Sequence, residues 1–352
     1  MGVSAPIPPG KTMEHLLSIE NLSVSFDTKD GIVHAVRDVS LQINKGETLA
    51  IVGESGCGKS VFCRSILKML PENADIRGKI LTKIHEKEQD IVRLSEREMC
   101  KIRGTNFGMV FQDPMAALNP VIPIGKQIIE AIRLHQKISK KEAEKKTIEL
   151  LELVGIDNPQ TRIHQQPHFF SGGMRQRCVL AIALALSPQI LFADEPTTAL
   201  DVTVQARLFD LLKDIQKKTG IAIVIVTHDL SVAARIADKV AVMYAGKIVE
   251  TGTAEEIFYQ AKHPYTWGLL GALPSLALKT GELKAIQGVP PSLINPPQGD
   301  AFAVRNEYAL AIDYTTPPPV FSLSETHKAA TWLLDKRAPH IPAPHYAQKN
   351  PL

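Results

Sequence analysis

Apolar residues along the first part of the chain occur in short runs separated by turn residues. β-Forming segments occupy residues 17–19, 22–26, 32–33 and 39–43, and Thr48–Val52 is a continuous apolar run. Short strands that follow one another through turns are typical of antiparallel sheets. The pattern therefore predicts an antiparallel β-layer that leads into a buried strand at 48–52.

Beyond residue 53, helical patterns alternate with fully apolar runs. Such alternation favours a parallel sheet covered by helices, and therefore an α/β fold. Pro71 ends the first helix, and Ser139 with Glu142 forms a capping box that opens the second. The expected helices are 60–70, 139–154, one from 173 and 202–218, and the expected strands are 106–111, 189–193 and 221–227.

Two segments interrupt this alternation and indicate the domain organisation. Residues 115–170 are mostly helical in pattern, which predicts a helical insert. From about residue 261 prolines punctuate the chain, which predicts a loop-rich extension. We expect an N-terminal extension at 1–16, an α/β domain at 17–260 that contains the insert, and a C-terminal extension at 261–352.

Composition excludes several classes of protein. A net charge of +3 over 352 residues, without a dense basic block, argues against nucleic acid as a partner. The longest apolar runs are far shorter than a membrane span, so a membrane role has to come through a partner. The N-terminus lacks the apolar region of a secretory signal, and the four cysteines have no Cys-x-x-Cys spacing, which predicts reduced thiols in the cytosol.

The segment Gly53–Ser60 fits the phosphate-loop pattern G-x-x-x-x-G-K-S between a strand and a helix. Its glycines let backbone N–H groups turn towards a phosphate, and the helix N-terminus adds positive potential. Lys59 can reach the terminal phosphates, and the Ser60 hydroxyl can hold Mg²⁺. The predicted ATP-binding residues here are Gly53, Glu54, Ser55, Gly56, Cys57, Gly58, Lys59, Ser60 and Val61.

Two further motifs are ambiguous when each is taken alone. Asp194 and Glu195 end an apolar strand, where they either cap a helix or bind Mg²⁺ and polarise water. Ser171, Gly172 and Gly173 open a helix, as an ordinary N-cap or as a second anion site. One nucleotide does not need two such loops in one subunit, so the second site makes sense if each nucleotide lies between two subunits.

Together these motifs resemble the ATP-binding subunits of ABC transporters across residues 17–258. Gly53–Ser60 resembles Walker A, and 192–195 resembles Walker B with its catalytic glutamate Glu195. Residues 171–176 resemble the signature motif, with Phe170 where Leu is usual. The remaining motifs are the Q-loop Gln112, the D-loop Asp201, the switch histidine His228, and Met174 and Gln176 within the signature.

The resemblance implies a mechanism and a set of site residues. Glu195 and His228 are the expected catalytic residues, and Ser60, Gln112 and Asp194 are expected to organise Mg²⁺. Two subunits would close head to tail, with ATP between Walker A of one and the signature of the other. Phe26 is the first candidate for stacking on adenine and His34 the second, although a core role for Phe26 is an equal alternative.

The segments at 52–56, 111–120 and 263–266 resemble the oligopeptide and dipeptide importer branch. In many members of that branch four cysteines of the C-terminal extension hold an iron–sulfur cluster. This chain has Asp300, Asn306, Asp313 and Thr331 there instead, so we expect no cluster. The apolar residues 332–334 are expected to pack the extension against the rest of the protein, against a partner ATPase or on itself.

The resemblance also implies partners and a location. We expect a second, related ATPase (OppF type), two permease subunits (OppB and OppC type) and an extracellular peptide-binding protein, with this chain peripheral at the cytoplasmic face of the membrane. An importer of nickel or another small solute is an alternative cargo class. A soluble ABC-type ATPase outside transport and a non-hydrolysing regulator remain alternatives, although Glu195 and His228 argue against the regulator.

Overall fold

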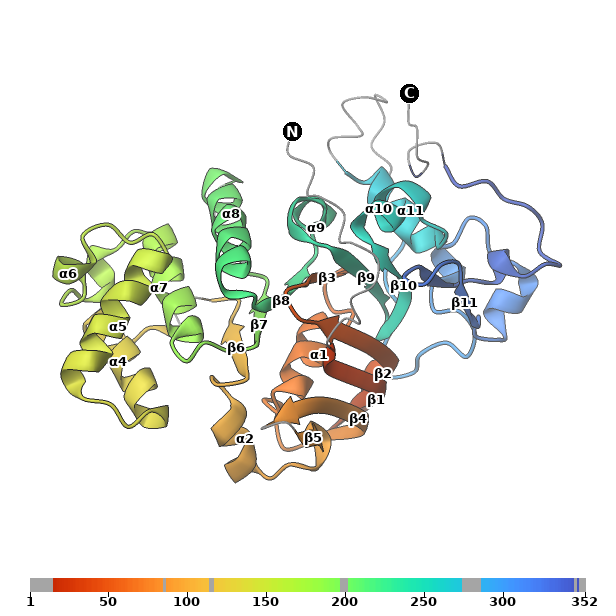
Figure 1. The fold of residues 1–352 in the computed structure, drawn as a ribbon. Helices are drawn as coiled ribbons and strands as arrows, with labels where there is room; N and C mark the ends of the chain where they lie inside the picture. Colours follow the sequence, from red (N-terminus) through yellow and green to blue (C-terminus); the bar gives the residue numbers. More distant parts are fainter. Residues whose placement is uncertain are drawn as a thin grey trace.

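A computed structural model describes residues 15–84, 87–113, 117–196, 202–273 and 286–344 together with 347. Three parts lie side by side in Figure 1. A sheet-based body occupies the centre, a group of helices lies on one side, and the C-terminal extension lies on the other. The expected α/β fold is confirmed.

The central sheet has the strand order β11-β12-β10-β9-β3-β8-β7-β6. Its middle strands pair in parallel, and β3, β7 and β8 are buried along their whole length, as the continuous apolar runs predicted. The carboxyl ends of these parallel strands therefore share one edge of the sheet. The bounds are β3 Thr48–Val52, β6 Phe107–Val110, β7 Ile190–Asp194, β8 Ala222–Thr227, β9 Lys239–Tyr244 and β10 Lys247–Thr253.

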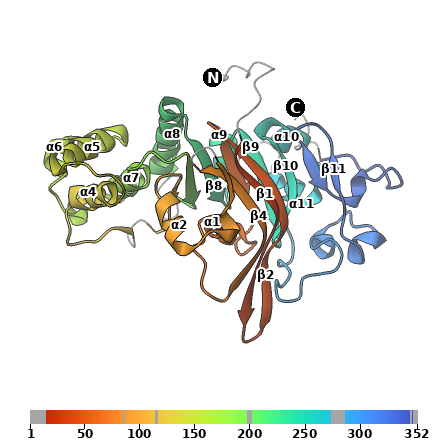
Figure 2. The ribbon, with the colours of Figure 1, turned by 60° about the horizontal axis from the view of Figure 1, so that its bottom comes forward.

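The predicted antiparallel β-layer is present, and it is larger than expected. Strands β1 (His15–Thr28) and β2 (Gly31–Asn44) form a long pair, and β4 (Ala74–Ile84) and β5 (Lys87–Asp90) add two strands that the sequence pattern did not indicate. Figure 2 shows this layer against the side of the central sheet. Helix α1 (Lys59–Ile66) shares one hydrophobic cluster with both sheets.

Helix α1 ends earlier than predicted, because the chain turns before Pro71 is reached. Lys68 adopts a left-handed conformation (φ 47°), which ends the helix at Ile66. Arg103, directly after helix α2 (Glu96–Ile102), donates hydrogen bonds to the carbonyl oxygens of Leu67 and Lys68. A distant side chain thus satisfies the helix end, which a local pattern does not reveal.

The helical insert forms as expected, and its apolar residues share one hydrophobic cluster with β6, β7, β8 and α8. The predicted capping box of Ser139 and Glu142 opens α5. The backbone N–H of each residue donates a hydrogen bond to the side chain of the other. Helix α7 packs against α4, α5 and β6, whereas α1 packs against β1, β2 and β7. The bounds of these and the following helices are α4 Ile124–His135, α5 Lys140–Leu153, α6 Pro159–Arg162, α7 Gly172–Leu184, α8 Val202–Thr219 and α9 Leu230–Ile236.

The C-terminal extension is more than the loop-rich appendage that its prolines predicted. After α10 (Ala254–Gln260) and α11 (Pro264–Gly271), the strands β11 (Val320–Ser322) and β12 (Lys328–Ala330) lengthen the central sheet, because β12 pairs with β10. A buried contact of 2.8 Å between His327 Nε2 and Glu250 Oε1 ties the two strands together. Residues from both sides of position 260 share one core.

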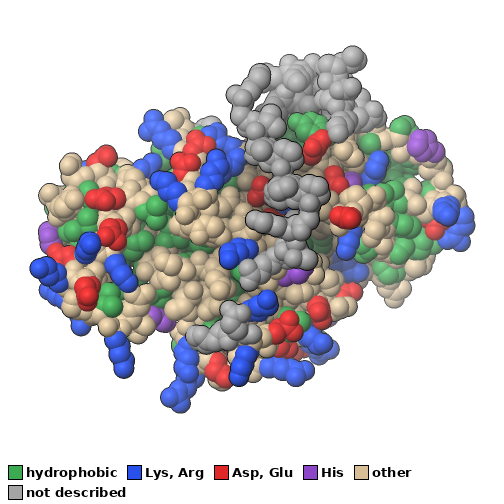
Figure 3. Space-filling view, viewed as in Figure 1, with side chains coloured by type: hydrophobic (Ala, Val, Ile, Leu, Met, Phe, Trp, Pro, Cys, Tyr) green, Lys and Arg blue, Asp and Glu red, His purple; other side chains and the backbone are tan. Residues whose placement is uncertain are grey.

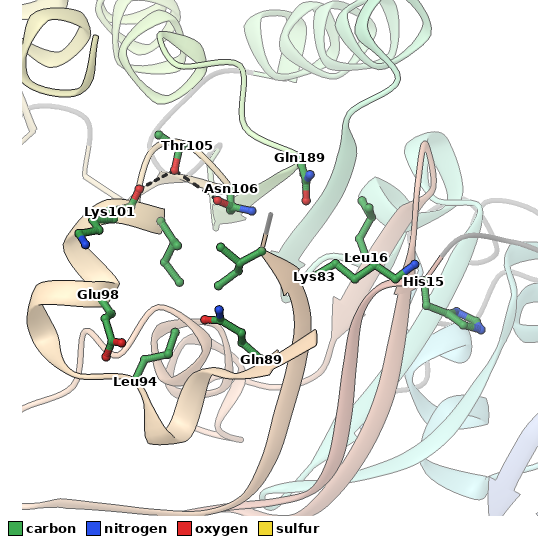
Figure 4. A pocket seen from close by; sticks show the side chains of 12 residues that line it. His15, Leu16, Lys83, Gln89, Leu94, Glu98, Lys101, Thr105, Asn106 and Gln189 are labelled. Atoms are coloured by element: carbon green, nitrogen blue, oxygen red, sulfur yellow. Dashed lines mark hydrogen bonds between the residues drawn. The ribbon is translucent and has the colours of Figure 1, made fainter. Parts of the chain in front are cut away.

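A hollow of about 630 Å³ lies at the opposite edge of the sheet from the strand ends that carry the motifs. Asn106 and Gln189, which precede β6 and β7, line it together with Lys101 of α2 (Figure 4). Thr105 donates a hydrogen bond to the Lys101 carbonyl there. Among the helices of the described residues, none combines the length and the apolar character that crossing a membrane requires.

Candidate functional site

The loop after β3 is shaped by close backbone approaches that only glycine permits. A Cβ atom on Gly53 would lie 2.1 Å from the Met243 carbonyl oxygen, and one on Gly58 would lie 2.1 Å from the Ala35 carbonyl oxygen. Both glycines, and Gly56 between them, have positive φ angles. The loop is therefore wedged between β2 and β9, and its curl brings the start of α1 against the end of β3.

Lys59 lies across this loop. Its Nζ donates hydrogen bonds to the carbonyl oxygens of Gly53 (2.7 Å) and Glu54 (2.8 Å). The neighbouring Cys57 is buried, and burial raises the pKa of its thiol, although Lys59 acts in the opposite direction. Cys57 is therefore a neutral packing residue whose Sγ lies 3.7 Å from Lys59 Nζ, while Val61 packs against the core behind it.

The loop after β3 and the end of β7 meet at Ser60 and Asp194. The Ser60 Oγ donates to Asp194 Oδ1 at 2.7 Å, and Arg64 Nη2 lies 3.4 Å from Asp194 Oδ2. Asp194 is almost fully buried at the end of β7. The arrangement presents two hard oxygen donors side by side at the strand ends.

Three predicted residues converge next to this pair. Glu195 has a left-handed backbone (φ 46°), and its N–H donates to the Val226 carbonyl oxygen of β8. Gln112 Nε2 lies 3.4 Å from Glu195 Oε2, and His228 Nδ1 lies 3.3 Å from Glu195 Oε1. Because β6, β7 and β8 pair in parallel, the residues that follow them gather at one edge of the sheet.

The signature segment belongs to a different part of the molecule. Ser171 caps α7 by accepting a hydrogen bond from the Met174 N–H, and Ser171 and Gly172 are exposed. Gly173 faces Val204 of α8, Met174 packs against the hydrophobic cluster that the insert shares with the central sheet, and Gln176 is buried. These residues therefore pack against the cluster that joins the insert to the central sheet, whereas the phosphate-loop residue Cys57 belongs to the cluster between the two sheets.

Two of the remaining predicted residues are described and one is not. Phe26 is half-buried on β1 and packs against the cluster below the β-layer. His34 on β2 is half-buried, and its N–H donates to the Leu293 carbonyl oxygen of the C-terminal extension. Asp201 lies outside the described residues.

Contacts from the C-terminal extension to the phosphate loop were missed by sequence reasoning. The Tyr265 hydroxyl accepts a hydrogen bond from the Glu54 N–H at 2.9 Å. Arg305 holds the Glu54 carboxylate with two hydrogen bonds. Arg305 lies 251 positions from Glu54, so no local pattern could have indicated the pair.

The four positions of the extension at which the sequence predicted no cluster ligand carry side-chain oxygens that accept backbone N–H groups. Asp300 accepts from Phe302, Asn306 from Tyr308, Asp313 from Leu310 and Thr331 from Leu333, at 2.6–3.3 Å. All four residues are buried, and burial raises the pKa of Asp313. Leu333 packs against the core near β10, and Trp332 donates to the Thr316 carbonyl oxygen within the extension.

We expect this extension to hold no iron–sulfur cluster, because clusters of this kind need thiolates and the last cysteine of the chain is Cys178. Protein purified without oxygen should be colourless, with no stoichiometric iron or acid-labile sulfide. A brown preparation with bound iron would show that the alignment of the four positions is wrong.

Family models match two stretches of the chain. The ABC transporter model matches residues 36–198, and the model of the oligopeptide/dipeptide transporter C-terminal region matches residues 249–312. Among solved structures, the dimeric post-hydrolysis state of the ATP-binding cassette MJ0796 bound to ADP and Pi has a TM-score of 0.59 and 27% identity, and the match covers 68% of this chain and 98% of that one.

Curated relatives match nearly the whole chain. The oligopeptide transport ATP-binding protein OppD of Bacillus subtilis (strain 168) is 54% identical over 94% of this chain and 92% of its own length. The dipeptide transport ATP-binding protein DppD of Lactococcus lactis subsp. cremoris (strain MG1363) is 52% identical over 93% of each chain. The oligopeptide transport ATP-binding protein AmiE of Streptococcus pneumoniae serotype 4 (strain ATCC BAA-334 / TIGR4) is 49% identical over 94% of this chain and 92% of its own.

These matches run through both the motif-bearing body and the C-terminal extension, and they agree with the fold. The chain therefore belongs to the ABC transporter family, in its branch of oligopeptide and dipeptide transport ATP-binding proteins.

Proposed function

We propose that this ABC ATPase hydrolyses ATP to drive a peptide importer and lies at the inner face of the membrane. The observation that carries the proposal is the meeting of Ser60 with Asp194, and of Gln112 and His228 with Glu195, at one edge of the sheet. The relatives that match over almost the whole chain are named as transport ATP-binding proteins for oligopeptides or dipeptides, which supports peptide as the cargo.

In the proposed role, the loop after β3 binds the phosphates of ATP. Backbone N–H groups of the Gly53–Ser60 loop, other than that of Glu54, which donates to Tyr265, face the phosphates. The Lys59 ammonium group exchanges its carbonyl partners for phosphate oxygens. Lys59 neutralises charge without covalent chemistry. Phe26 remains our candidate for the adenine contact.

The residues at the proposed magnesium site fit that ion. Ser60 and Asp194 supply hard oxygen atoms 2.7 Å apart, which is the donor chemistry that Mg²⁺ prefers. The Gln112 amide, our third proposed ligand, lies beside the neighbouring Glu195. When bound, Mg²⁺ neutralises the charge that develops on the phosphate oxygens. Arg64 balances the charge of the buried Asp194 at the same place.

Glu195 is the proposed general base. Its carboxylate lies between the amide of Gln112 and the imidazole of His228, so both of its oxygens are fixed in direction. A carboxylate held in this way orients an attacking water and takes its proton. We assign His228, whose side chain is 58% exposed, to the contact with the γ-phosphate region.

The exposed start of α7 supports a site shared by two subunits. Ser171 and Gly172 present the N-terminus of the 13-residue helix α7 to solvent, away from the chain's own phosphate loop. In our proposal this end completes the nucleotide site of a second, OppF-type ATPase, together with the D-loop residue Asp201. The dimeric solved cassette of similar fold agrees with such pairing.

The proposed assembly also contains two permease subunits of OppB and OppC type and a peptide-binding protein outside the membrane. Charges of both signs are interspersed on the face shown in Figure 3, and hydrophobic side chains gather over the C-terminal extension. Val304 and Val320 of the extension are 81% and 64% exposed. A subunit that docks to partners needs no membrane helix of its own.

Co-purification from membranes tests this assembly. Solubilised membranes that contain the tagged chain should yield two polytopic membrane proteins and a second ATPase in stoichiometric amounts. Recovery of the chain without membrane proteins, or with nucleic acid, would contradict the proposal.

A further inference from the structure

Two groups of the C-terminal extension hold a single residue of the phosphate loop. Arg305 Nη1 and Nη2 donate to the two carboxylate oxygens of Glu54 at 2.6 and 2.9 Å, and the Tyr265 hydroxyl accepts from the Glu54 N–H at 2.9 Å. The remaining polar group of Glu54, its carbonyl oxygen, accepts from Lys59 Nζ at 2.8 Å. The first part of the loop is thus tied on one side to the extension and on the other to Lys59.

The Arg305 contact is built into a buried cluster. The side chain is only 4% exposed, and Arg305 Nη1 also donates to the Tyr244 hydroxyl at 3.1 Å. Its guanidinium lies over the rings of Tyr244 and Phe302, 5.7 and 6.0 Å from their centroids. The Glu54 side chain is 27% exposed, so the pair is half-buried, and a bidentate, charge-assisted pair of this kind is strong and geometrically specific.

The pair also changes the electrostatics of the loop. An ionised Glu54 beside bound phosphates would repel them, and because its side chain is only 27% exposed, water screens this repulsion incompletely. Arg305 neutralises this carboxylate from the side of the extension. Tyr265 meanwhile fixes the direction of the peptide group between Gly53 and Glu54, whose Gly53 carbonyl oxygen is one partner of Lys59.

We propose that Arg305 and Tyr265 are positioning residues of the nucleotide site, through which the C-terminal extension sets the affinity for ATP. The inference rests on the proposed binding of ATP at Gly53–Ser60. Neither residue contacts nucleotide; both act through Glu54. The extension is thereby a working part of the ATPase, and a change in its packing is transmitted to the phosphate loop.

The test compares Arg305→Gln with wild type in the full chain, by nucleotide binding, and in the assembled transporter, by ATPase kinetics. We expect the dissociation constant and the KM for ATP to rise on the order of tenfold, which corresponds to about 1.4 kcal/mol. The kcat at saturating ATP should change little, because Glu195 and His228 are untouched. Arg305→Lys should give an intermediate KM, since it keeps the positive charge and loses the paired N–H donors of the guanidinium group.

A double variant distinguishes the loss of charge compensation at Glu54 from a general loss of stability. Because Arg305→Gln leaves Glu54 uncompensated, Arg305→Gln combined with Glu54→Gln should recover much of the lost affinity. Arg337→Gln is the matched control, because it breaks the exposed pair of Arg337 and Asp335 within the extension, away from the loop. If Arg305→Gln fails to fold, Tyr265→Phe provides the test, because it removes only the hydroxyl oxygen. A raised KM for ATP in Tyr265→Phe would then support the proposal.

An unchanged affinity for ATP in folded Arg305→Gln, or in Tyr265→Phe, would overturn the inference. Losses that simply add in the double variant would also overturn it, because they would show that the pair only stabilises the fold. Failure of the proposed function has a different signature: wild type itself would then bind no ATP.

Discussion

Replacing Glu195 by Gln is expected to lower ATP hydrolysis by ~10²-fold or more in the assembled transporter, as for loss of a general base. The amide is close in size to the carboxylate and keeps an oxygen between Gln112 and His228, but it cannot accept a proton from water. ATP binding should persist, because the phosphate loop and Lys59 are unchanged. The variant should therefore accumulate with ATP bound in a closed complex.

Two measurements test this prediction for Glu195→Gln. Release of phosphate reports hydrolysis, and retention of labelled ATP by the purified complex reports binding. Asp229→Asn is a suitable control, because Asp229 lies next to His228 and its side chain caps α9 by accepting a hydrogen bond from the Ser231 N–H. Near-normal turnover by Glu195→Gln would remove Glu195 from the role of general base.

Replacing Ser171 by Arg should abolish hydrolysis at the site that this chain completes on its partner, while ATP binding to its own phosphate loop stays intact. The reason is steric and electrostatic, since a bulky cation would fill the space that the exposed end of α7 offers to the γ-phosphate. Nucleotide binding is measured on the isolated chain and hydrolysis on the complex.

The Ser171 experiment has a built-in check on folding. Ser171→Ala removes the cap of α7, which costs about 1 kcal/mol of helix stability, but it adds no bulk. If hydrolysis is lost in the Arg variant far beyond the loss in the Ala variant, the effect comes from the shared site. A loss of ATP binding by the isolated Arg variant would contradict a site shared between subunits.

Local patterns predicted those parts of the fold whose causes are local. Gly53 and Gly58 are required because backbone carbonyls approach them closely, and the sequence pattern of the loop carries that requirement. The continuous apolar runs of β7 and β8 predicted their burial in a parallel sheet. Parallel pairing then placed Asp194, Glu195 and His228 at one edge.

Features that depend on distant pairing were not predictable in this way. Strands β4 and β5 join the antiparallel layer through β1, and β12 reaches the central sheet through β10, although neither segment has a strong strand pattern. The carbonyl oxygens at the early end of α1 are satisfied by Arg103, which is distant in sequence. The ion pair of Arg305 with Glu54 depends on the fold of the whole extension.

The central claim is that ATP hydrolysis by this chain drives peptide uptake. The direct measurement is uptake of a labelled oligopeptide into vesicles that contain the purified transporter, with ATP inside and the peptide-binding protein outside. We predict accumulation with the wild-type chain and none above background with Glu195→Gln. Uptake that proceeds equally with both chains, or wild-type vesicles that hydrolyse ATP without moving any peptide, would contradict the account.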